Sequence, residues 1–121
     1  MKHRILVIDD EQNARDALKT ILTEEGYEVG EAADGEEGLA ALTSFRPDAV
    51  LCDIRMPKMD GLALLSKARS DGHQCVFVMV TAFASIETAV QAMKAGAEDY
   101  VTKPVDVSSV LAKLEKVLEK V

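Results

Sequence analysis

The sequence predicts an α/β fold in which helices cover both faces of a five-stranded parallel sheet. Short apolar runs alternate along the chain with segments whose apolar residues recur at helical spacing, as in repeated βα units. Three of the runs are continuously apolar and rich in β-branched residues, as expected for strands buried on both faces. With 121 residues, of which 48% are apolar, we expect residues 1–121 to form one domain.

Five runs are predicted to be strands, and three of them form the centre of the sheet. The second and fifth runs are shorter and more mixed, which is typical of edge strands. Five βα units with right-handed crossovers favour an open, doubly wound sheet with strand order 2-1-3-4-5, the flavodoxin-like arrangement. In chain order, the runs are residues 5–8, 27–29, 49–52, 76–80 and 100–102.

The first three helices are predicted from apolar spacing and capping residues. Gly26 can end the first helix in a left-handed conformation. The segment 34–37 resembles a capping box that opens the second helix, and Asp60 or Gly61 opens the third. The apolar positions of these helices are Ala14, Ala17, Leu18, Ile21, Leu22, Leu39, Leu42, Leu62 and Leu65.

Two further helices follow the fourth and fifth strands. Ser85 can cap the fourth helix, which Gly96 would stop, and Asp106 can cap the fifth. The apolar stripe of the fifth helix is suited to the core, and part of it also to a dimer interface. The apolar residues are Ile86, Ala89, Val90 and Met93 in the fourth helix, and Val107, Val110, Leu111, Leu114, Val117, Leu118 and Val121 in the fifth.

Charge and composition exclude several kinds of partner. Fourteen Lys and Arg against 21 Asp and Glu give a net charge of −7, a field that repels nucleic acid and anionic lipid. No apolar run approaches the roughly 20 residues of a membrane helix, and no signal-peptide pattern opens the sequence. Cys52 and Cys75 lack metal-binding spacing and are interpreted as core residues of the central strands. We therefore expect a soluble, cytoplasmic protein that binds neither nucleic acid nor membranes directly.

Reactive side chains follow four of the five predicted strands. Ligands of doubly wound sheets bind at the carboxyl ends of the strands where the strand order reverses, here between the first and third strands. Taken singly, each side chain has an ordinary interpretation as a helix cap, a turn residue or a surface amine. Their coincidence at one edge of the sheet indicates a functional site. These residues are Asp9, Asp10, Asp53, Thr81 and Lys103.

The three aspartates predict a divalent metal. Carboxylates held close together repel one another unless a cation joins them, and oxygen ligands without His or Cys favour Mg²⁺. Mg²⁺ also accepts phosphate oxygens, so the residues favour phosphoryl transfer. In that chemistry Asp53 would be the nucleophile and become an aspartyl phosphate, while Thr81 and Lys103 would bind the phosphate oxygens.

At these residues the chain resembles the receiver domains of two-component response regulators, over essentially its whole length. Four motifs carry the resemblance in the family's order and spacing: residues 8–11 (IDDE), 53–61 (DIRMPKMDG), 80–82 (VTA) and 100–104 (YVTKP). Val105 departs from the pattern, since many receivers have a larger apolar residue there. The stretch 81–97 is similar to receivers attached to enhancer-binding transcription activators.

The resemblance implies a phosphorylation-activated switch that is not an enzyme but catalyses its own phosphorylation and dephosphorylation. Asp53 would accept the phosphoryl group from a sensor histidine kinase. Asp10 and Asp53 would bind Mg²⁺ directly, Asp9 would bind it directly or through a water molecule, and Arg55 would bind it through its backbone carbonyl. From the bulk of their side chains, we further expect Arg55 and Phe83 to screen the acyl phosphate from water, which would make its lifetime longer than that of fast motility-type receivers.

The resemblance further implies that Thr81 and Tyr100 act as the switch. Thr81 would move toward the phosphate, and Tyr100 would then turn from an exposed to a buried position. This movement would change the face formed by the fourth helix, the fifth strand and the fifth helix. An output domain or downstream protein would bind that face, and phosphorylation could also favour a homodimer. Exposed residues around the first helix would determine which kinase is recognised.

Two other functions would use the same residues. A Mg²⁺-dependent phosphatase with an aspartate nucleophile is one alternative, but residues 9–11 (DDE) lack the Asp-x-Asp spacing of such enzymes. A pseudo-receiver that only binds other proteins is the second alternative. Such modules normally lack one of the site residues, and here all of them are present.

Overall fold

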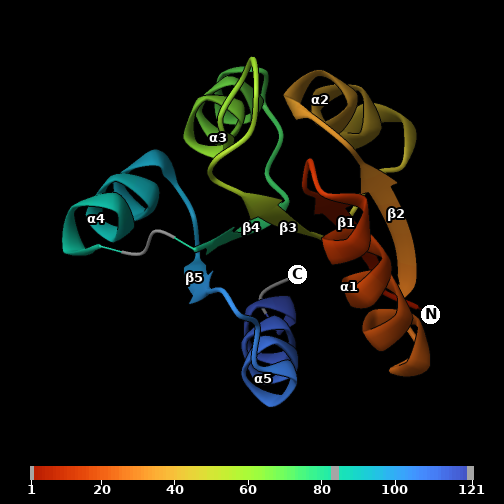
Figure 1. Cartoon of the computed structure of the whole chain (residues 1–121). Coiled ribbons are helices and arrows are strands. Elements are labelled where there is room, and N and C mark those ends of the chain that lie inside the picture. The colour runs from red at the N-terminus through yellow and green to blue at the C-terminus, as the bar shows by residue number, and fades with distance from the viewer. Residues whose placement is uncertain (1, 83–84, 120–121) are drawn as a thin grey trace.

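A parallel five-stranded sheet forms the centre of the computed structural model, which describes residues 2–82 and 85–119 (Figure 1). The strand order is β2-β1-β3-β4-β5, as predicted. Strands and helices alternate along the chain, and all neighbouring strands are parallel. In chain order, the elements are β1 (Arg4–Ile8), α1 (Gln12–Glu24), β2 (Glu28–Ala32), α2 (Gly35–Ser44), β3 (Ala49–Asp53), α3 (Gly61–Ser70), β4 (Val76–Thr81), α4 (Ile86–Ala95), β5 (Asp99–Thr102) and α5 (Val107–Leu118).

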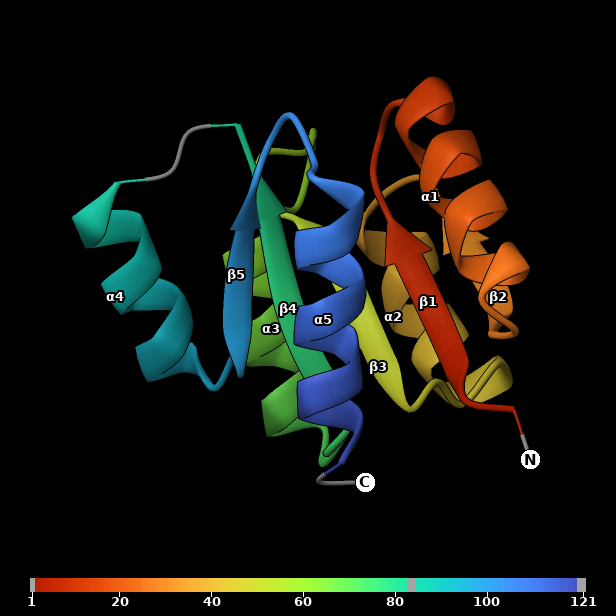
Figure 2. The ribbon, with the colours of Figure 1, turned by 90° about the horizontal axis from the view of Figure 1, so that it is seen from below.

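Helices cover the two faces of the sheet in two groups (Figure 1). Successive residues of β1 point to opposite faces, so Ile5 and Val7 join the core on the side of α1 and α5, whereas Leu6 and Ile8 join the core on the side of α2, α3 and α4. The strands point in one direction, and the loops that follow them lie at one edge (Figure 2). This arrangement confirms the predicted doubly wound sheet.

The predicted helix caps are largely confirmed. Asp34, Asp60 and Ser85 each accept a hydrogen bond from the backbone N–H three residues later, at 2.8, 2.8 and 3.0 Å. Gly96 ends α4 in the left-handed region with φ of 108°. Asp106 occupies the residue before α5, but its side chain makes no capping hydrogen bond, so the prediction for its carboxylate is wrong.

The apolar stripes of α4 and α5 have different environments. In α5 the stripe is mostly core, because Val110, Leu114, Val117 and Leu118 are buried. In α4 only Ala92 is buried among the described side chains. The apolar face predicted for α4 therefore exists, but it is turned toward solvent, with Ile86, Val90 and Met93 between 44% and 86% exposed. Val121 lies outside the described residues.

The prediction for the cysteines is correct for one residue and wrong for the other. Cys52 is buried within β3, whereas Cys75 precedes β4 and is only half-buried. β4 begins at Val76, so Cys75 lies just outside the strand and is not part of its buried run. Within the described residues, every helix is too short or too polar to cross a lipid bilayer.

Candidate functional site

Three carboxylates meet where β1 and β3 end. Asp53 is the last residue of β3, and Asp9 and Asp10 directly follow β1. Because β1 and β3 are paired neighbours, their ends lie side by side. Each of the three residues offers a carboxylate oxygen, and these oxygens lie within 4.8 Å of one another. Asp9 and Asp53 are buried and Asp10 is exposed, so the cluster opens to solvent on the side of Asp10.

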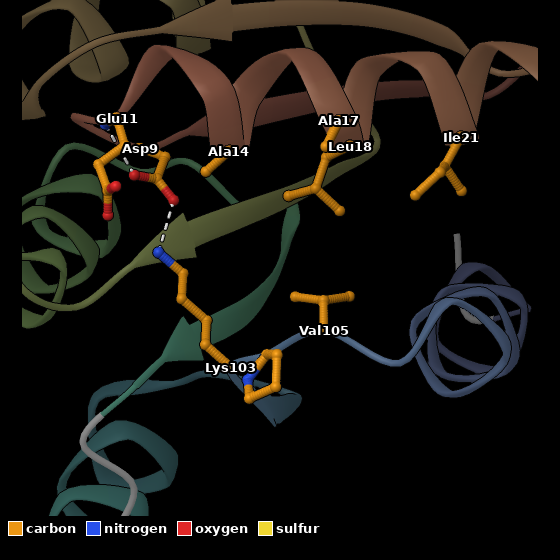
Figure 3. A pocket seen from close by; sticks show the side chains of 9 residues that line it. Asp9, Glu11, Ala14, Ala17, Leu18, Ile21, Lys103 and Val105 are labelled. Carbon is orange, nitrogen blue, oxygen red and sulfur yellow. Dashed lines mark hydrogen bonds and ion pairs between the residues drawn. The ribbon is translucent and has the colours of Figure 1, made fainter.

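Lys103 joins this cluster from the loop after β5. Its ammonium donates hydrogen bonds to Oδ2 of Asp9 at 2.8 Å and to Oδ2 of Asp53 at 3.2 Å. Figure 3 shows the side chain of Lys103 reaching across to Asp9. The Lys103–Pro104 peptide bond, whose isomer the sequence left open, is cis. The lysine thus offsets part of the negative charge of two buried carboxylates.

The two buried aspartates are oriented in the same way. Oδ1 of Asp9 accepts a hydrogen bond from the backbone N–H of Glu11 at 3.0 Å, and Oδ1 of Asp53 accepts one from that of Arg55 at 3.2 Å. Each carboxylate therefore uses one oxygen to fix its own loop and the other to bind Lys103.

Burial and the neighbouring charges shift the acidity of this cluster. Burial raises the pKa of Asp53 above its ordinary value, even though the hydrogen bond and charge of Lys103 act in the opposite direction. For Lys103, burial lowers the pKa, but the hydrogen bonds to Asp9 and Asp53 outweigh this effect and raise the pKa overall. Asp53 is therefore a more basic carboxylate than usual, and Lys103 beside it keeps its proton and positive charge. This pair suits a nucleophile that lies next to an anion-binding group.

A small cavity of about 160 Å³ adjoins the cluster, and Arg55 and Ala82 also line it. The cavity lies at the carboxyl ends of the strands, where ligands of such sheets bind, and a phosphate-sized ligand in it would contact the lysine and the carboxylates together. Its lining residues are Asp10, Glu11, Asp53, Arg55, Ala82 and Lys103. Phe83, the other side chain predicted to screen this space, lies outside the described residues.

The two predicted switch residues stand on the adjacent strands β4 and β5. Thr81 is the last residue of β4, is 1% exposed, and accepts a hydrogen bond from the backbone N–H of Lys103 through its own carbonyl at 2.8 Å. Tyr100 lies in β5, is half-buried, and packs against the core beside α4. Thr81 is thereby tied to the lysine of the cluster through the backbone.

Two cationic residues that contact these elements were not predicted from the sequence. Lys113 of α5 donates to the carbonyl of Tyr100 at 2.7 Å, and its ammonium lies 5.6 Å from the centre of the tyrosine ring. Arg15 of α1 donates to the carbonyl of Asp9 at 2.7 Å. Both residues occupy polar positions of amphipathic helices, so the sequence carries no local signal that distinguishes them from other surface cations.

An apolar groove of about 370 Å³ runs from the cluster along α1 (Figure 3). Asp9, Glu11 and Lys103 lie at its polar end, next to the carboxylate cluster. Its apolar side chains come from α1 and from the segment after Lys103: Ala14, Ala17, Leu18, Ile21, Pro104 and Val105. A partner lying in this groove would therefore reach the cluster at one end.

Known proteins are similar to this chain in sequence. The chain is 40% identical over 117 residues to the regulatory protein AtoC of Escherichia coli, covering 97% of this chain and 25% of AtoC. It is 39% identical over 120 residues to the response regulator MprA of Mycolicibacterium vanbaalenii, covering 99% of this chain and 52% of MprA. The chain thus spans between a quarter and about half of the length of these relatives.

A solved structure shows the same fold. The CheY-like response regulator receiver domain protein from Methanospirillum hungatei superposes with a TM-score of 0.93 at 39% sequence identity, covering 99% of this chain and 96% of that one. The family model of the response regulator receiver domain matches residues 5–115, which include the carboxylate cluster, Thr81, Tyr100 and Lys103. The chain therefore belongs to the family of response regulator receiver domains.

Proposed function

We propose that this chain is a phosphorylation-activated switch in which Asp53 accepts a phosphoryl group from the phosphohistidine of a sensor histidine kinase. Receiver domains are phosphoacceptor switches of two-component systems. The observation that carries the proposal is the cluster in which Asp53 lies with two further carboxylates and 3.2 Å from the ammonium of Lys103. A nucleophilic oxygen and an anion-binding cation are thus adjacent.

The donor set of the cluster fits Mg²⁺. Asp9, Asp10 and Asp53 provide only carboxylate oxygens, which are hard ligands, and the exposed side of the cluster leaves room for water and phosphate oxygens. These three residues and the backbone carbonyl of Arg55 would hold the ion. When bound, Mg²⁺ would neutralise charge on the phosphoryl oxygens during transfer.

The chain's own side chains supply the remaining chemistry. An oxygen of Asp53 attacks the phosphorus, an O–P bond forms, and the P–N bond to the donor histidine breaks with its electron pair left on the imidazole. Lys103 binds one phosphoryl oxygen through its ammonium, and the hydroxyl of Thr81 donates to another. The domain thereby catalyses its own phosphorylation, and hydrolysis of the acyl phosphate by water, with Arg55 screening the site, returns it to the resting state.

Phosphorylation would be transmitted through the strands that adjoin the cluster. The phosphoryl group adds negative charge and acceptor oxygens at Asp53, which draw Lys103 and Thr81 toward it. Tyr100 then turns further inward and changes the face formed by α4, β5 and α5. The contact of Lys103 with the backbone of Thr81 and the position of Tyr100 on the neighbouring strand support this route.

The partners of this switch follow from its two accessible surfaces. The groove along α1 would receive the kinase, because its polar end lies at the cluster. The face of α4, β5 and α5 would bind an output domain or downstream protein, or a second phosphorylated copy. We propose that the output is transcription regulation in the cytoplasm, of the enhancer-binding activator type, and that the acidic domain does not itself bind nucleic acid.

Intact-mass measurement after incubation with acetyl phosphate and Mg²⁺ tests the proposal. We expect one added phosphoryl group that hydroxylamine removes and that EDTA prevents from forming. The Asp53→Asn protein should stay unmodified. Asp60→Asn is the matched control, because it removes another loop carboxylate while Asn still caps α3, and it should be phosphorylated like the wild type.

Two other outcomes would contradict the proposal. A folded wild-type protein that stays unmodified with both acetyl phosphate and a phosphorylated histidine kinase would favour the pseudo-receiver. Multiple-turnover hydrolysis of unrelated phosphate esters would favour the phosphatase.

A further inference from the structure

We infer that Arg15 is a positioning residue that holds the loop after β1 in the conformation required for Mg²⁺ binding. The inference rests on the metal site of the proposed function. Arg15 stands on the first turns of α1, and its side chain is only 14% exposed. Its guanidinium contacts the backbone of the carboxylate loop on one side and a carboxylate of β2 on the other.

The first contact acts on the peptide that joins two members of the cluster. Nη1 of Arg15 donates to the carbonyl oxygen of Asp9 at 2.7 Å. This carbonyl belongs to the planar peptide group between Asp9 and Asp10, so fixing its direction also fixes the direction in which the chain enters Asp10. The exposed carboxylate of Asp10 thus depends on a backbone group that Arg15 holds.

The second contact fixes Arg15 itself. Its Nε donates to Oε1 of Glu31 at 3.3 Å, and Glu31 is part of β2, which is paired with β1 along its length. The loop is therefore attached to the sheet through a side chain as well as through its own strand. The hydrogen bond from Lys19 outweighs the effect of burial and, with that from Arg15, lowers the pKa of Glu31, which keeps this carboxylate ionised.

Lys19 provides an internal comparison. Its ammonium binds the other oxygen of Glu31 at 3.1 Å and is 49% exposed. It therefore shares a partner with Arg15 but lies a full turn further along α1, away from the carboxylate loop. Removing either cation takes one hydrogen bond from Glu31, whereas only the change at Arg15 also takes one from Asp9.

The planar fork of arginine explains why this residue type stands here. A guanidinium donates in two fixed directions at once, to Glu31 from Nε and to Asp9 from Nη1. An ammonium has no such fixed fork, so Arg15→Lys should keep the charge but hold the loop less firmly. Residues that orient metal ligands typically change metal affinity by about tenfold or more when replaced.

Calorimetric titration with Mg²⁺, without any phosphodonor, tests the inference. We expect Arg15→Gln to weaken Mg²⁺ binding about tenfold, and Arg15→Lys and Glu31→Gln to weaken it measurably but less. Lys19→Gln, the matched control, should bind Mg²⁺ like the wild type. Circular dichroism of each variant in EDTA measures folding separately from metal binding, so a loss of affinity in a folded variant reports on the loop.

The outcomes separate this inference from the proposed function. A wild type that binds no Mg²⁺ would overturn the metal site and the inference with it. Wild-type affinity in folded Arg15→Gln, or in both Arg15→Lys and Glu31→Gln if Arg15→Gln does not fold, would overturn the inference alone. An equal loss of affinity in Lys19→Gln would also overturn it, because the effect would then come from Glu31 or from surface charge.

Discussion

Lys103 connects the ends of three strands through a single ammonium group. It comes from the segment after β5 and binds Asp53 at the end of β3 and Asp9 just after β1. A change of charge at Asp53 therefore alters the interactions of Lys103 and, through them, those of Asp9. The connection needs no movement of a helix, since all three side chains already touch.

The first prediction concerns the pH dependence of stability at Asp53. Because its pKa is raised on folding, the folded protein binds more protons than the unfolded chain between the ordinary pKa of aspartate, about 4, and the raised value. The contribution of Asp53 to stability therefore falls as the pH rises through this window. We expect Asp53→Asn to be more stable than the wild type at pH 7 in EDTA, with a melting temperature about 4 °C higher for each kcal/mol gained.

Thermal unfolding followed by circular dichroism at pH 7, 5.5 and 4 checks this prediction. The advantage of Asp53→Asn should shrink toward pH 4, where the wild-type carboxyl becomes protonated. The comparison variant is Asp60→Asn, which changes a carboxylate that caps α3. An advantage that persists or grows at pH 4 would contradict the explanation from burial of charge.

Among the elements, α3 and α4 differ in how firmly they are packed. Each spans ten residues, but α3 has four buried residues and α4 has one. The carboxyl end of α4 is nevertheless attached, because Arg69 of α3 donates from Nη2 to the carbonyl of Gly96 at 3.0 Å. The same guanidinium binds the carbonyls of His73 and Cys75 before β4, both at 2.9 Å. We therefore regard α4 as a helix held mainly at one end.

The second prediction is that backbone amides of α4 exchange with solvent faster than those of α3. Local opening needs less free energy where fewer apolar side chains leave the core. Hydrogen–deuterium exchange followed by mass spectrometry should show α4 peptides labelled about tenfold faster than α3 peptides at neutral pH. Arg69→Gln should increase the difference, since it releases the carboxyl end of α4. Equal protection of the two helices would contradict this picture.

The third prediction concerns the start of α3. Gly61 lies against the end of β3, and its N–H donates to the carbonyl of Ile54 at 2.7 Å. A Cβ at this position would overlap the backbone carbonyl of Asp53 and lie 2.9 Å from the Cα of Ile54. Because backbone atoms cannot move aside, Gly61→Ala should destabilise the protein by about 3 kcal/mol and displace Asp53.

Urea unfolding measures the stability loss, and phosphorylation by acetyl phosphate measures the displacement. Gly30→Ala is the control, since the three atoms nearest to its Cβ would all belong to the ring of Phe45, from 3.1 Å, and a side chain can shift. It should cost about 1 kcal/mol or less and leave phosphorylation intact. Similar losses in the two variants would show that close contact with the backbone of β3 is not the cause.

Local patterns predicted the elements and the position of the cluster, whereas contacts between distant elements were not predictable. Asp9 and Asp53 follow apolar runs, and strand order alone places such ends together. The carboxylate of Asp34 caps α2 by accepting from the backbone N–H of Glu37, three residues later, a contact that the local sequence also predicts. By contrast, Arg15 and Lys113 find their partners only after helices have packed on the sheet. No helical periodicity distinguishes them from other cations.

The same limit applies to side-chain environment. The apolar residues predicted to share a face of α4 include Val90 and Met93, which are exposed, whereas the smaller Ala92 is buried. Cys75 adjoins an apolar run but lies before the strand begins, where Arg69 binds its carbonyl. Apolar pattern predicts which residues share a face, but not which face another element covers.

At the scale of the whole molecule, exposed apolar side chains gather on α4 while the net charge is −7. Ile86, Val90 and Met93 lie on one helix at 86%, 44% and 48% exposure. Charge of one sign keeps copies of the domain apart, whereas burial of these side chains would favour contact. Because these two effects oppose each other, a change in the conformation or charge of the α4 face should alter how strongly two copies of the domain associate.

The fourth prediction is that phosphorylation promotes a dimer through α4. In sedimentation velocity, the wild type treated with acetyl phosphate and Mg²⁺ should dimerise more tightly than the untreated protein. Val90→Glu should weaken this dimer at least about tenfold, because it places a charge in the buried contact. Ala17→Glu, on the exposed surface of α1, is the control with the same charge change. Equal effects of the two variants would indicate repulsion by net charge and contradict a contact through α4.

The contacts of Tyr100 have a consequence for how copies of this domain can associate. β5 is the last strand of the sheet, and such an edge can accept a strand from another chain. Here the N–H of Tyr100 already donates to Asp99 at 2.8 Å, and its carbonyl accepts from Lys113. An incoming strand would have to break both hydrogen bonds. At this position of β5, the domain's own contacts therefore oppose the addition of a strand from another copy.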